Sequence, residues 1–235
     1  MERIKRLVKK TPVVRDIARA AMRHMAAQTA GSFKSAVYWE NRYRSGRNSG
    51  AGSHNRLARF KAGVLNDFVE REAIKSVVEF GSGDGSQLQL ARYPSYVGVD
   101  VSQTALEMTR YLHADDSTKT FIHADEVGPE HAAELALSLD VIYHLIEDEV
   151  FEAYMVRLFD AAERFVIVYS SNEDRQGDSV HVRHRRFTDW VERNRPNFRQ
   201  IGLIKNLYPE NIKEPDNTSF ADFYIFERAP EASHA

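Results

Sequence analysis

From residue 76 to the C-terminus, short apolar runs rich in β-branched and aromatic residues alternate with segments whose apolar positions recur at helical spacing. The apolar runs predict strands near 76–80, 95–99, 119–123, 134–139, 164–170, 200–206 and 220–227. The amphipathic segments predict helices near 85–92, 103–113 and 147–162. This alternation is typical of a doubly wound α/β sheet, which is mostly parallel and binds ligands at the carboxyl ends of its strands.

The last two apolar runs are joined without a strong helical pattern between them, unlike the earlier runs. Parallel neighbours need a long crossover, whereas antiparallel neighbours need only a loop. The segment ADFYIFER is therefore predicted to be an antiparallel strand inserted at the sheet edge. The predicted fold class is a Rossmann-like, seven-stranded, mostly parallel sheet with that one antiparallel strand, plus an N-terminal helical arm that forms a partial lid.

The first 48 residues differ from the rest in charge. They contain 12 Lys and Arg against 3 Asp and Glu, a net charge of +9, whereas the remainder contains 20 against 31, a net charge of −11. Their apolar positions have helical spacing that Pro12 interrupts, which favours two short helices over one long helix. Such an arm can contact an anionic surface, meaning a membrane, a nucleic acid or an acidic partner, or it can be a solvated leader.

A segment rich in Gly and Ser, residues 45–53, separates this arm from everything after it, as a linker or a mobile loop would. The predicted organisation is a basic helical arm at 1–48, one domain at 49–230 and a tail at 231–235. The 235 residues, 43% of them hydrophobic, suit one α/β domain with a substantial core.

Cysteine is absent from the chain, which excludes disulfides, thiolate zinc sites and a cysteine nucleophile. No apolar run approaches the roughly 18 residues that a membrane-spanning helix needs. The basic start is not followed by the apolar segment of a secretory signal. We therefore expect a cytoplasmic protein, either free or peripheral to the membrane.

The stretch VVEFGSGDGSQL contains the strongest chemical signal in the chain. An apolar run ending at Glu79 is followed by three alternating glycines, Gly81, Gly83 and Gly85. A dinucleotide fingerprint needs a third glycine where this chain has Ser86, and a P-loop needs a lysine that is missing here. A second acid, Asp100, ends the next predicted strand and can accept both hydroxyls of a ribose. The pattern favours a nucleoside cofactor without a phosphate cradle, with a nicotinamide or nucleotide enzyme as the alternative.

These features resemble class I S-adenosylmethionine-dependent methyltransferases. Other segments fit the order of that family: YWENRY upstream, FIHAD after the third strand, LALSLDVIYHL at the fourth and RFVIVYSSN at the fifth. The resemblance implies S-adenosylmethionine as the cofactor, with Asp100 at its ribose, Asp125 at its adenine amino group and glycine backbone at its amino-acid end. The cofactor-binding residues implied in this way are Tyr38, Tyr43, Glu79, Gly81, Gly83, Gly85, Asp100, Val101, Asp125 and Leu139.

Methyl transfer from a sulfonium needs an aligned acceptor and often the removal of its proton. Asp140 and His144 stand at i and i+4, so a helix starting at Asp140 would put both on one face. In one arrangement His144 or His181 is a general base that Asp140 orients. In another, Asp140, His144 and a later histidine such as His181 hold Mg²⁺ or Mn²⁺, which polarises the substrate. The second resembles metal-dependent O-methyltransferases, whose E-x-x-E-H motif has an acid where this chain has Tyr143.

The segment HVRHRRF follows the fifth strand, where this fold builds its substrate wall. Its arginines would suit an anionic substrate, such as a phosphorylated or nucleotide-linked sugar, a carboxylate or a glycan acid. The predicted substrate-binding residues are Arg183, His184 and Arg186.

The predicted function is O-methylation of a small polar acceptor, such as a sugar or glycan end in polysaccharide or natural-product biosynthesis. No large recognition domain interrupts the chain, and its pattern resembles small bacterial methyltransferases of saccharide pathways. The alternatives are an N-methyltransferase, an RNA methyltransferase and a non-catalytic cofactor-binding partner protein. The acidic balance of residues beyond 48 disfavours a large nucleic-acid surface.

Overall fold

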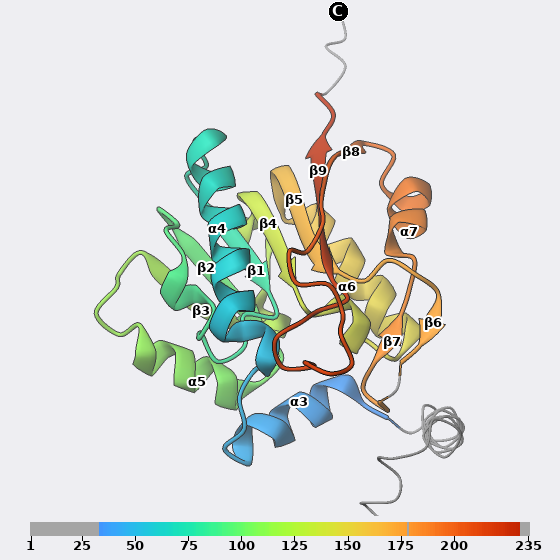
Figure 1. Cartoon of the computed structure of the whole chain (residues 1–235). Coiled ribbons are helices and arrows are strands. Elements are labelled where there is room, and N and C mark those ends of the chain that lie inside the picture. The colour runs from blue at the N-terminus through green and yellow to red at the C-terminus, as the bar shows by residue number, and fades with distance from the viewer. Residues whose placement is uncertain (1–32, 178, 231–235) are drawn as a thin grey trace, which may run out of the picture.

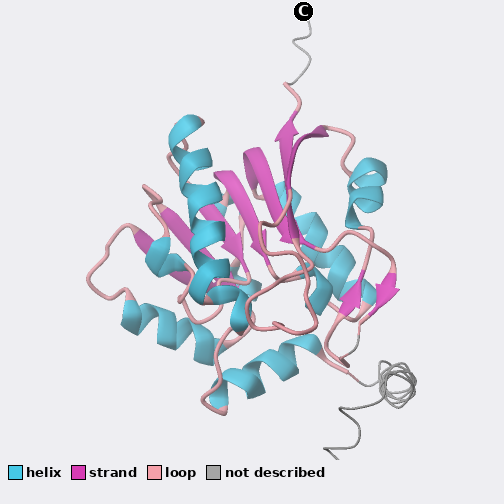
Figure 2. Cartoon of the chain, viewed as in Figure 1, coloured by secondary structure: helices cyan, strands magenta, loops and turns pink. Residues whose placement is uncertain are grey.

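A computed structural model gives the structure of residues 33–177 and 179–230. A seven-stranded sheet of order β3-β2-β1-β4-β5-β9-β8 lies between helices (Figures 1 and 2). Its strands are β1 (Val77–Phe80), β2 (Tyr96–Asp100), β3 (Lys119–His123), β4 (Ala133–Leu139), β5 (Ala162–Ser170), β8 (Phe198–Ile204) and β9 (Asp222–Arg228). The α-helices are α3 (Ser35–Arg44), α4 (Asn55–Arg71), α5 (Gln103–Leu112), α6 (Asp148–Asp160) and α7 (Phe187–Asn194). Most of the predicted arm and the whole predicted tail lie outside the described residues.

Strands β1 to β5 run parallel, and β9 pairs antiparallel with both β5 and the edge strand β8. The predicted fold class is therefore confirmed, with the antiparallel strand inserted one place in from the edge. All seven predicted strands are found, each within two residues of its predicted bounds. In the register, Phe80 lies opposite both Val99 and Ser138, so the carboxyl ends of β1, β2 and β4 finish side by side.

The helices cover the two faces of the sheet with separate clusters of buried side chains. Leu65 and Phe68 of α4 and Leu106 of α5 pack on one face. Met155 of α6 and Trp190 of α7 pack on the other. Each large apolar side chain buried in this way contributes about 1.5–3 kcal/mol of transfer free energy. The amphipathic pattern of these helices thus fixes which side of each helix packs on the sheet, and the central strands β1 and β4 between them are almost fully buried.

The prediction of a helix near 85–92 was wrong. Only a single 3₁₀ turn, η3 (Leu88–Leu90), lies there. The side-chain amide of Asn66 on α4 donates to the carbonyl of Leu90 (2.9 Å), and its oxygen accepts from the N–H of Arg92 (2.8 Å). Backbone groups that a helix would have paired internally are satisfied by a neighbouring side chain, so the segment can run extended into β2.

Helix α3 lies across the carboxyl end of the sheet, where Figure 1 shows it below the strands. Its first residue is tied to the segment after β4, because the hydroxyl of Ser35 donates to the carbonyl of His144 (2.9 Å). Its middle is tied to α5, because the carboxylate of Glu40 accepts from the hydroxyls of Ser102 (2.7 Å) and Thr104 (2.6 Å). The helix therefore bridges the two halves of the sheet. None of the described helices is long and apolar enough to cross a membrane.

The Gly- and Ser-rich segment, residues 45–53, is an ordered strap rather than a free linker. The backbone N–H of Ser49 donates to the carboxylate of Asp84 (2.8 Å), and its hydroxyl accepts from the N–H of Asp84 (3.2 Å). The same hydroxyl is 3.0 Å from the phenol oxygen of Tyr43. The strap therefore fastens the end of α3 to the loop after β1, which contains Gly81, Gly83 and Gly85 and is called the glycine loop below.

Candidate active site

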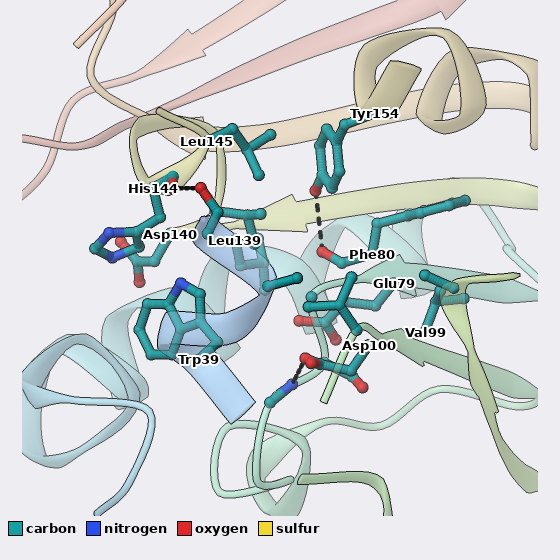
Figure 3. A pocket seen from close by; sticks show the side chains of 18 of the residues that line it. Trp39, Glu79, Phe80, Val99, Asp100, Leu139, Asp140, His144, Leu145 and Tyr154 are labelled. Atoms are coloured by element: carbon teal, nitrogen blue, oxygen red, sulfur yellow. Dashed lines mark hydrogen bonds between the residues drawn. The ribbon is translucent and has the colours of Figure 1, made fainter. Parts of the chain in front are cut away.

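A cavity of about 370 Å³ opens between α3 and the carboxyl ends of β1, β2 and β4. Figure 3 shows Trp39 and His144 at one side of it and Glu79 and Asp100 at the other. The predicted site residues that line this first cavity are Tyr43, Glu79, Gly81, Gly83, Asp100, Val101, Leu139, Asp140 and His144. These residues come from the ends of β1, β2 and β4 and from α3, as expected for ligand binding in this type of sheet.

The glycine loop adopts a backbone that other residues resist. Gly81, Gly83 and Gly85 have φ angles of 82°, 59° and 77°. A Cβ atom on Gly83 would lie 2.5 Å from the hydroxyl oxygen of Ser49 and 3.0 Å from the phenol oxygen of Tyr43. The glycines are therefore required by the fold itself, both for their left-handed conformation and for the close approach of the strap.

Asp100 is buried at the end of β2 and holds the loop in place. One carboxylate oxygen accepts from the N–H of Gly83 (2.8 Å) and the other from the N–H of Ser102 (2.9 Å). Burial raises the pKa of this carboxyl, while these backbone donors oppose the increase. Each oxygen can accept a second hydrogen bond, so the carboxylate can still receive two hydroxyls from the cavity.

Glu79 lies buried at the end of β1, where its carboxylate accepts a hydrogen bond from the phenol of Tyr96 (2.8 Å). Burial raises its pKa to about 7, against the opposing effects of Tyr96 and the nearby ammonium of Lys61. The group thus changes charge close to neutral pH. A cationic ligand in the cavity would favour its ionised form.

His144 is held as a neutral imidazole of defined tautomer. Its Nδ1 lies 2.8 Å from the backbone oxygen of His181, which can only accept, so Nδ1 carries the proton and Nε2 keeps a free lone pair. Burial lowers the pKa of His144 to about 4. The ring contacts Trp39 edge-on, with ring centroids 4.8 Å apart, and stacks on His181 at 5.4 Å.

The prediction that Asp140 and His144 share a helix face was wrong. Asp140 has a φ of 62°, which begins a turn, and His144 ends a 3₁₀ helix, η6 (Ile142–His144). The carboxylate of Asp140 is occupied by the ammonium of Lys61 (2.7 Å) and the phenol of Tyr143 (2.8 Å). The imidazole proton goes to the His181 carbonyl, so Asp140 does not orient His144.

The side chains proposed as metal ligands do not form a metal site. Across residues 33–177 and 179–230, no group of three or more His, Asp and Glu is placed to hold an ion. Asp140 is paired with a lysine, and Nδ1 of His144 is committed to a carbonyl. The donor set does not fit Mg²⁺ or Mn²⁺, which prefer several oxygen ligands.

Other predicted residues lie beside the cavity without lining it. Tyr38 stacks on His181 with ring centroids 4.7 Å apart and thereby supports the wall behind His144. Asp125 lies in a 3₁₀ turn, η4 (Ala124–Glu126), and its side chain is 84% exposed beside His123. Gly85 packs against Thr109 of α5, which a Cβ atom would approach to 2.8 Å.

The predicted substrate residues Arg183, His184 and Arg186 line a different pocket, around a short hairpin of β6 (Arg175–Gln176) and β7 (Arg183–His184). His184 is buried, and its Nδ1 lies 2.7 Å from the hydroxyl of Ser171. The structure therefore separates these residues from the first cavity.

Trp39, Lys61 and Tyr154 are among the lining residues that were not predicted as site residues. Lys61 is 1% exposed and lies four residues from both Leu57 and Leu65 on the buried face of α4. A lysine within an apolar helical face was the signal that could have identified it. Tyr154 donates to the carbonyl of Phe80 (3.0 Å) from α6, a contact for which the local sequence carries no pattern.

No family model and no curated protein matches this sequence. Solved structures do match its fold. The N-methyltransferase NodS from Bradyrhizobium japonicum WM9, in complex with S-adenosyl-L-homocysteine, aligns with a TM-score of 0.67 at 12% identity, over 84% of this chain and 100% of NodS.

Magnesium protoporphyrin IX methyltransferase from Synechocystis PCC 6803, with bound S-adenosylmethionine, aligns with a TM-score of 0.58 at 14% identity, over 84% of this chain and 98% of that one. The methyltransferase domain of bacterial CtHen1-C aligns with a TM-score of 0.56 at 17% identity, over 72% and 97%. The described chain therefore has the Rossmann-like fold of class I S-adenosylmethionine-dependent methyltransferases.

Proposed function

We propose that this protein is an S-adenosylmethionine-dependent methyltransferase that methylates a hydroxyl of a small polar acceptor. The observation that carries the proposal is the composition of the first cavity, where a carboxylate and glycine backbone face a neutral imidazole across one opening. Structural neighbours of the same fold bind S-adenosylmethionine or its demethylated product, which supports the choice of cofactor.

The β1 and β2 side of the cavity suits the cofactor. Asp100 would accept the ribose hydroxyls, since each of its oxygens retains acceptor capacity after bonding Gly83 and Ser102. Glu79 would be ionised by the cationic cofactor. When bound, the cofactor supplies an electrophilic methyl group on a sulfonium. The remaining contributions come from groups of the chain that position the acceptor and receive its proton.

His144 is proposed as the proton acceptor. Its Nε2 is unprotonated near neutral pH, because burial lowers the pKa and the carbonyl of His181 fixes the proton on Nδ1. As the methyl group is transferred, the acceptor hydroxyl would lose its proton to Nε2. His144 lies on the side of the cavity opposite Glu79 and Asp100 (Figure 3), so the proposed base stands away from the carboxylates that are proposed to bind the cofactor.

The acceptor is proposed to be a small polar molecule or the exposed end of a larger one, such as a sugar or glycan. Helix α3 and the strap roof the cavity and are fastened at Ser35, Glu40 and Ser49. A roof of this kind excludes a bulky acceptor from the reacting centre. The Lys61–Asp140 pair on the cavity wall offers both a donor and an acceptor to hydroxyl groups.

An amine is the second candidate acceptor, because NodS, an N-methyltransferase, shares the fold over its whole length. A neutral amine attacks through its own lone pair, and the ammonium that forms loses its proton readily, so an amine depends less on a base than a hydroxyl does. The two candidates therefore differ in how strongly turnover depends on His144.

A screen for S-adenosylhomocysteine release tests the function. The purified chain would be incubated with S-adenosylmethionine and with paired panels of sugars and their amino-sugar counterparts. We expect release with hydroxyl acceptors and the methyl group on oxygen by mass spectrometry. Release only with the amino sugars would replace O-methylation by N-methylation, and cofactor binding without release for any acceptor would favour a non-catalytic partner protein.

A further inference from the structure

A second pocket, of about 390 Å³, lies between the β6–β7 hairpin, the start of α6 and helix α7. Eight of its twelve lining residues are charged, and five of these are arginines. Its lining residues, which define the arginine pocket, are Asp148, Phe151, Glu152, Asp174, Arg175, Gln176, Arg183, His184, Arg185, Arg186, Trp190 and Arg193. A pocket of this size with such a lining suits a small, strongly polar ligand.

The acids of this pocket are already used by the wall. Asp148 accepts from Arg183 (2.9 Å) and Arg185 (3.0 Å). Asp174 accepts from the backbone N–H of Arg186 (3.0 Å), and Glu152 accepts from the indole N–H of Trp190. All three acids therefore hold the pocket's own wall together, and Asp148 also pairs with two of its arginines.

Two of the arginine side chains, those of Arg186 and Arg193, are available to bind a ligand. The side chains of Arg186 and Arg193 are exposed, and neither makes an ion pair or hydrogen bond within the part of the chain that the structure describes. Arg175 adds a third guanidinium, whose pair with Glu173 at 2.9 Å is solvent-exposed and so worth little. Five arginines against three acids leave the pocket with a net charge of +2. Guanidinium groups arranged in this way select anions with several oxygens, above all phosphate.

The arginine pocket shares a wall with the first cavity. Arg185 is 9% exposed, and its guanidinium donates to the carbonyls of Leu145 and Ile146 (3.0 Å to the latter). His144 and Leu145 line the first cavity, while Asp148 lines the arginine pocket. His144 and Asp148 are four residues apart, which is at most about 14 Å of extended chain, so the walls of the two pockets adjoin along this segment.

We propose that the arginine pocket binds a phosphate group carried by the methyl acceptor, while the acceptor hydroxyl is held in the first cavity. Arg186 and Arg193 would form the ion pairs with phosphate oxygens, and Arg185 would hold the dividing wall. That the bound phosphate belongs to the methyl acceptor rests on the proposed function. That the pocket binds an anion is independent of the proposed function.

The two tryptophans of the chain allow anion binding in the arginine pocket and cofactor binding in the first cavity to be measured separately. Trp39 lines the first cavity and Trp190 the arginine pocket. In the variant Trp39→Phe, fluorescence reports on the arginine pocket alone, and inorganic pyrophosphate is expected to change it saturably at low salt. In Trp190→Phe, S-adenosylmethionine is expected to change the signal of Trp39. A response to S-adenosylmethionine without any to pyrophosphate would overturn the phosphate site and leave the proposed function standing.

Removal of the free arginines is the decisive variant. In the Trp39→Phe background, Arg186→Ala with Arg193→Ala should weaken pyrophosphate binding by more than about tenfold, the loss of charge-assisted hydrogen bonds. The matched control is Arg59→Ala, another exposed arginine, on α4 and so on the opposite face of the sheet. Equal weakening by both changes would show only general attraction of anions and would overturn the site.

The source of the phosphate is tested by turnover. Release of S-adenosylhomocysteine would be compared for sugar phosphates and the same sugars without phosphate. We expect the phosphorylated members to be preferred through a lower KM, with that preference lost in the double arginine variant. Pyrophosphate binding combined with equal turnover of both forms would mean that the pocket binds free phosphate and that the acceptor carries none.

Discussion

The first cavity has two walls that are built by different means. At β1 and β2 the glycine wall, Glu79, Gly81, Gly83 and Asp100, consists of backbone in left-handed conformation fixed by buried carboxylates. At β4 and α3 the histidine wall, Trp39, His144 and Leu145, consists of side-chain packing set by partners far away in sequence. In the proposed function, the first wall binds the cofactor and the second receives the acceptor.

Replacing His144, the proposed base, should produce the largest difference between the walls. His144→Gln keeps a hydrogen-bond donor toward the carbonyl of His181 but removes the basic nitrogen. Turnover of a hydroxyl acceptor should fall by about 100- to 10,000-fold, the usual contribution of a general base. The Kd for S-adenosylmethionine, measured by calorimetry, should stay within about threefold, because His144 lies across the cavity from Glu79 and Asp100 (Figure 3). Unchanged turnover would remove His144 from the mechanism.

The buried Lys61–Asp140 ion pair on the cavity wall should matter for stability more than for cofactor binding. Lys61→Met leaves the carboxylate of Asp140 without its cation, with Lys61 only 1% exposed in the parent chain. The free energy of unfolding, from urea denaturation, should fall by about 3 kcal/mol. Adding Asp140→Asn should restore part of the loss. The exposed control Lys213→Met should change little, and a similar loss there would contradict the account.

The glycine wall is tested by adding one methyl group. Gly83→Ala combines a positive φ with a contact of 2.5 Å to the hydroxyl oxygen of Ser49. Unfolding free energy should fall by about 1–3 kcal/mol, and S-adenosylmethionine binding should weaken as the strap is displaced. Gly46→Ala is the matched control, because Gly46 has a φ of 76° but no atom within 4 Å of its Cβ position. Equal losses would mean that backbone strain alone matters and that the strap does not press on the loop.

The smallest expected difference between the walls is in how folding stability depends on pH, because Glu79 and His144 act in opposite directions. The pKa of Glu79 is raised from 4.5 to about 7, so the folded state binds the extra proton and stability falls as the pH rises through 7. The pKa of His144 is lowered from 6.5 to about 4, so the unfolded state binds the extra proton and stability falls as the pH is lowered from 6.5 toward 4.

The two contributions oppose each other between about pH 4.5 and 6.5. Glu79→Gln should therefore reveal a stability that rises with pH in that window, and His144→Gln one that falls. Melting temperatures across the range provide the measurement. Parallel pH profiles in the two variants would show that one or both of these groups lies in a different environment.

The sequence predicts the glycine wall better than the histidine wall because of how far apart the partners lie. Gly83 lies in the loop after β1, and Asp100, 17 residues further on, ends β2, the next strand along the chain. The partner of the His144 ring is a carbonyl 37 residues away, and the partner of Asp140 is a lysine 79 residues away. No spacing rule connects such pairs, which explains why Asp140 was assigned to the wrong neighbour.

Strands could be predicted almost in full because a buried strand is a continuous apolar run, readable without knowledge of its neighbours. The segment near 85–92 shows the opposite case. Its extended path depends on the side chain of Asn66, which belongs to another helix. The separation of Arg183 and Arg186 from the first cavity likewise depends on the path of the β6–β7 hairpin. The local sequence pattern carries no signal for that path.

Calorimetric titration with S-adenosylmethionine tests the central claim most directly. The parent chain and Asp216→Ala, which alters an exposed loop acid, should bind it with the same Kd. Asp100→Ala should bind it about 100-fold more weakly, through the loss of two hydrogen bonds from a buried carboxylate. Binding of NAD without binding of S-adenosylmethionine, or equal affinity in Asp100→Ala, would contradict the account.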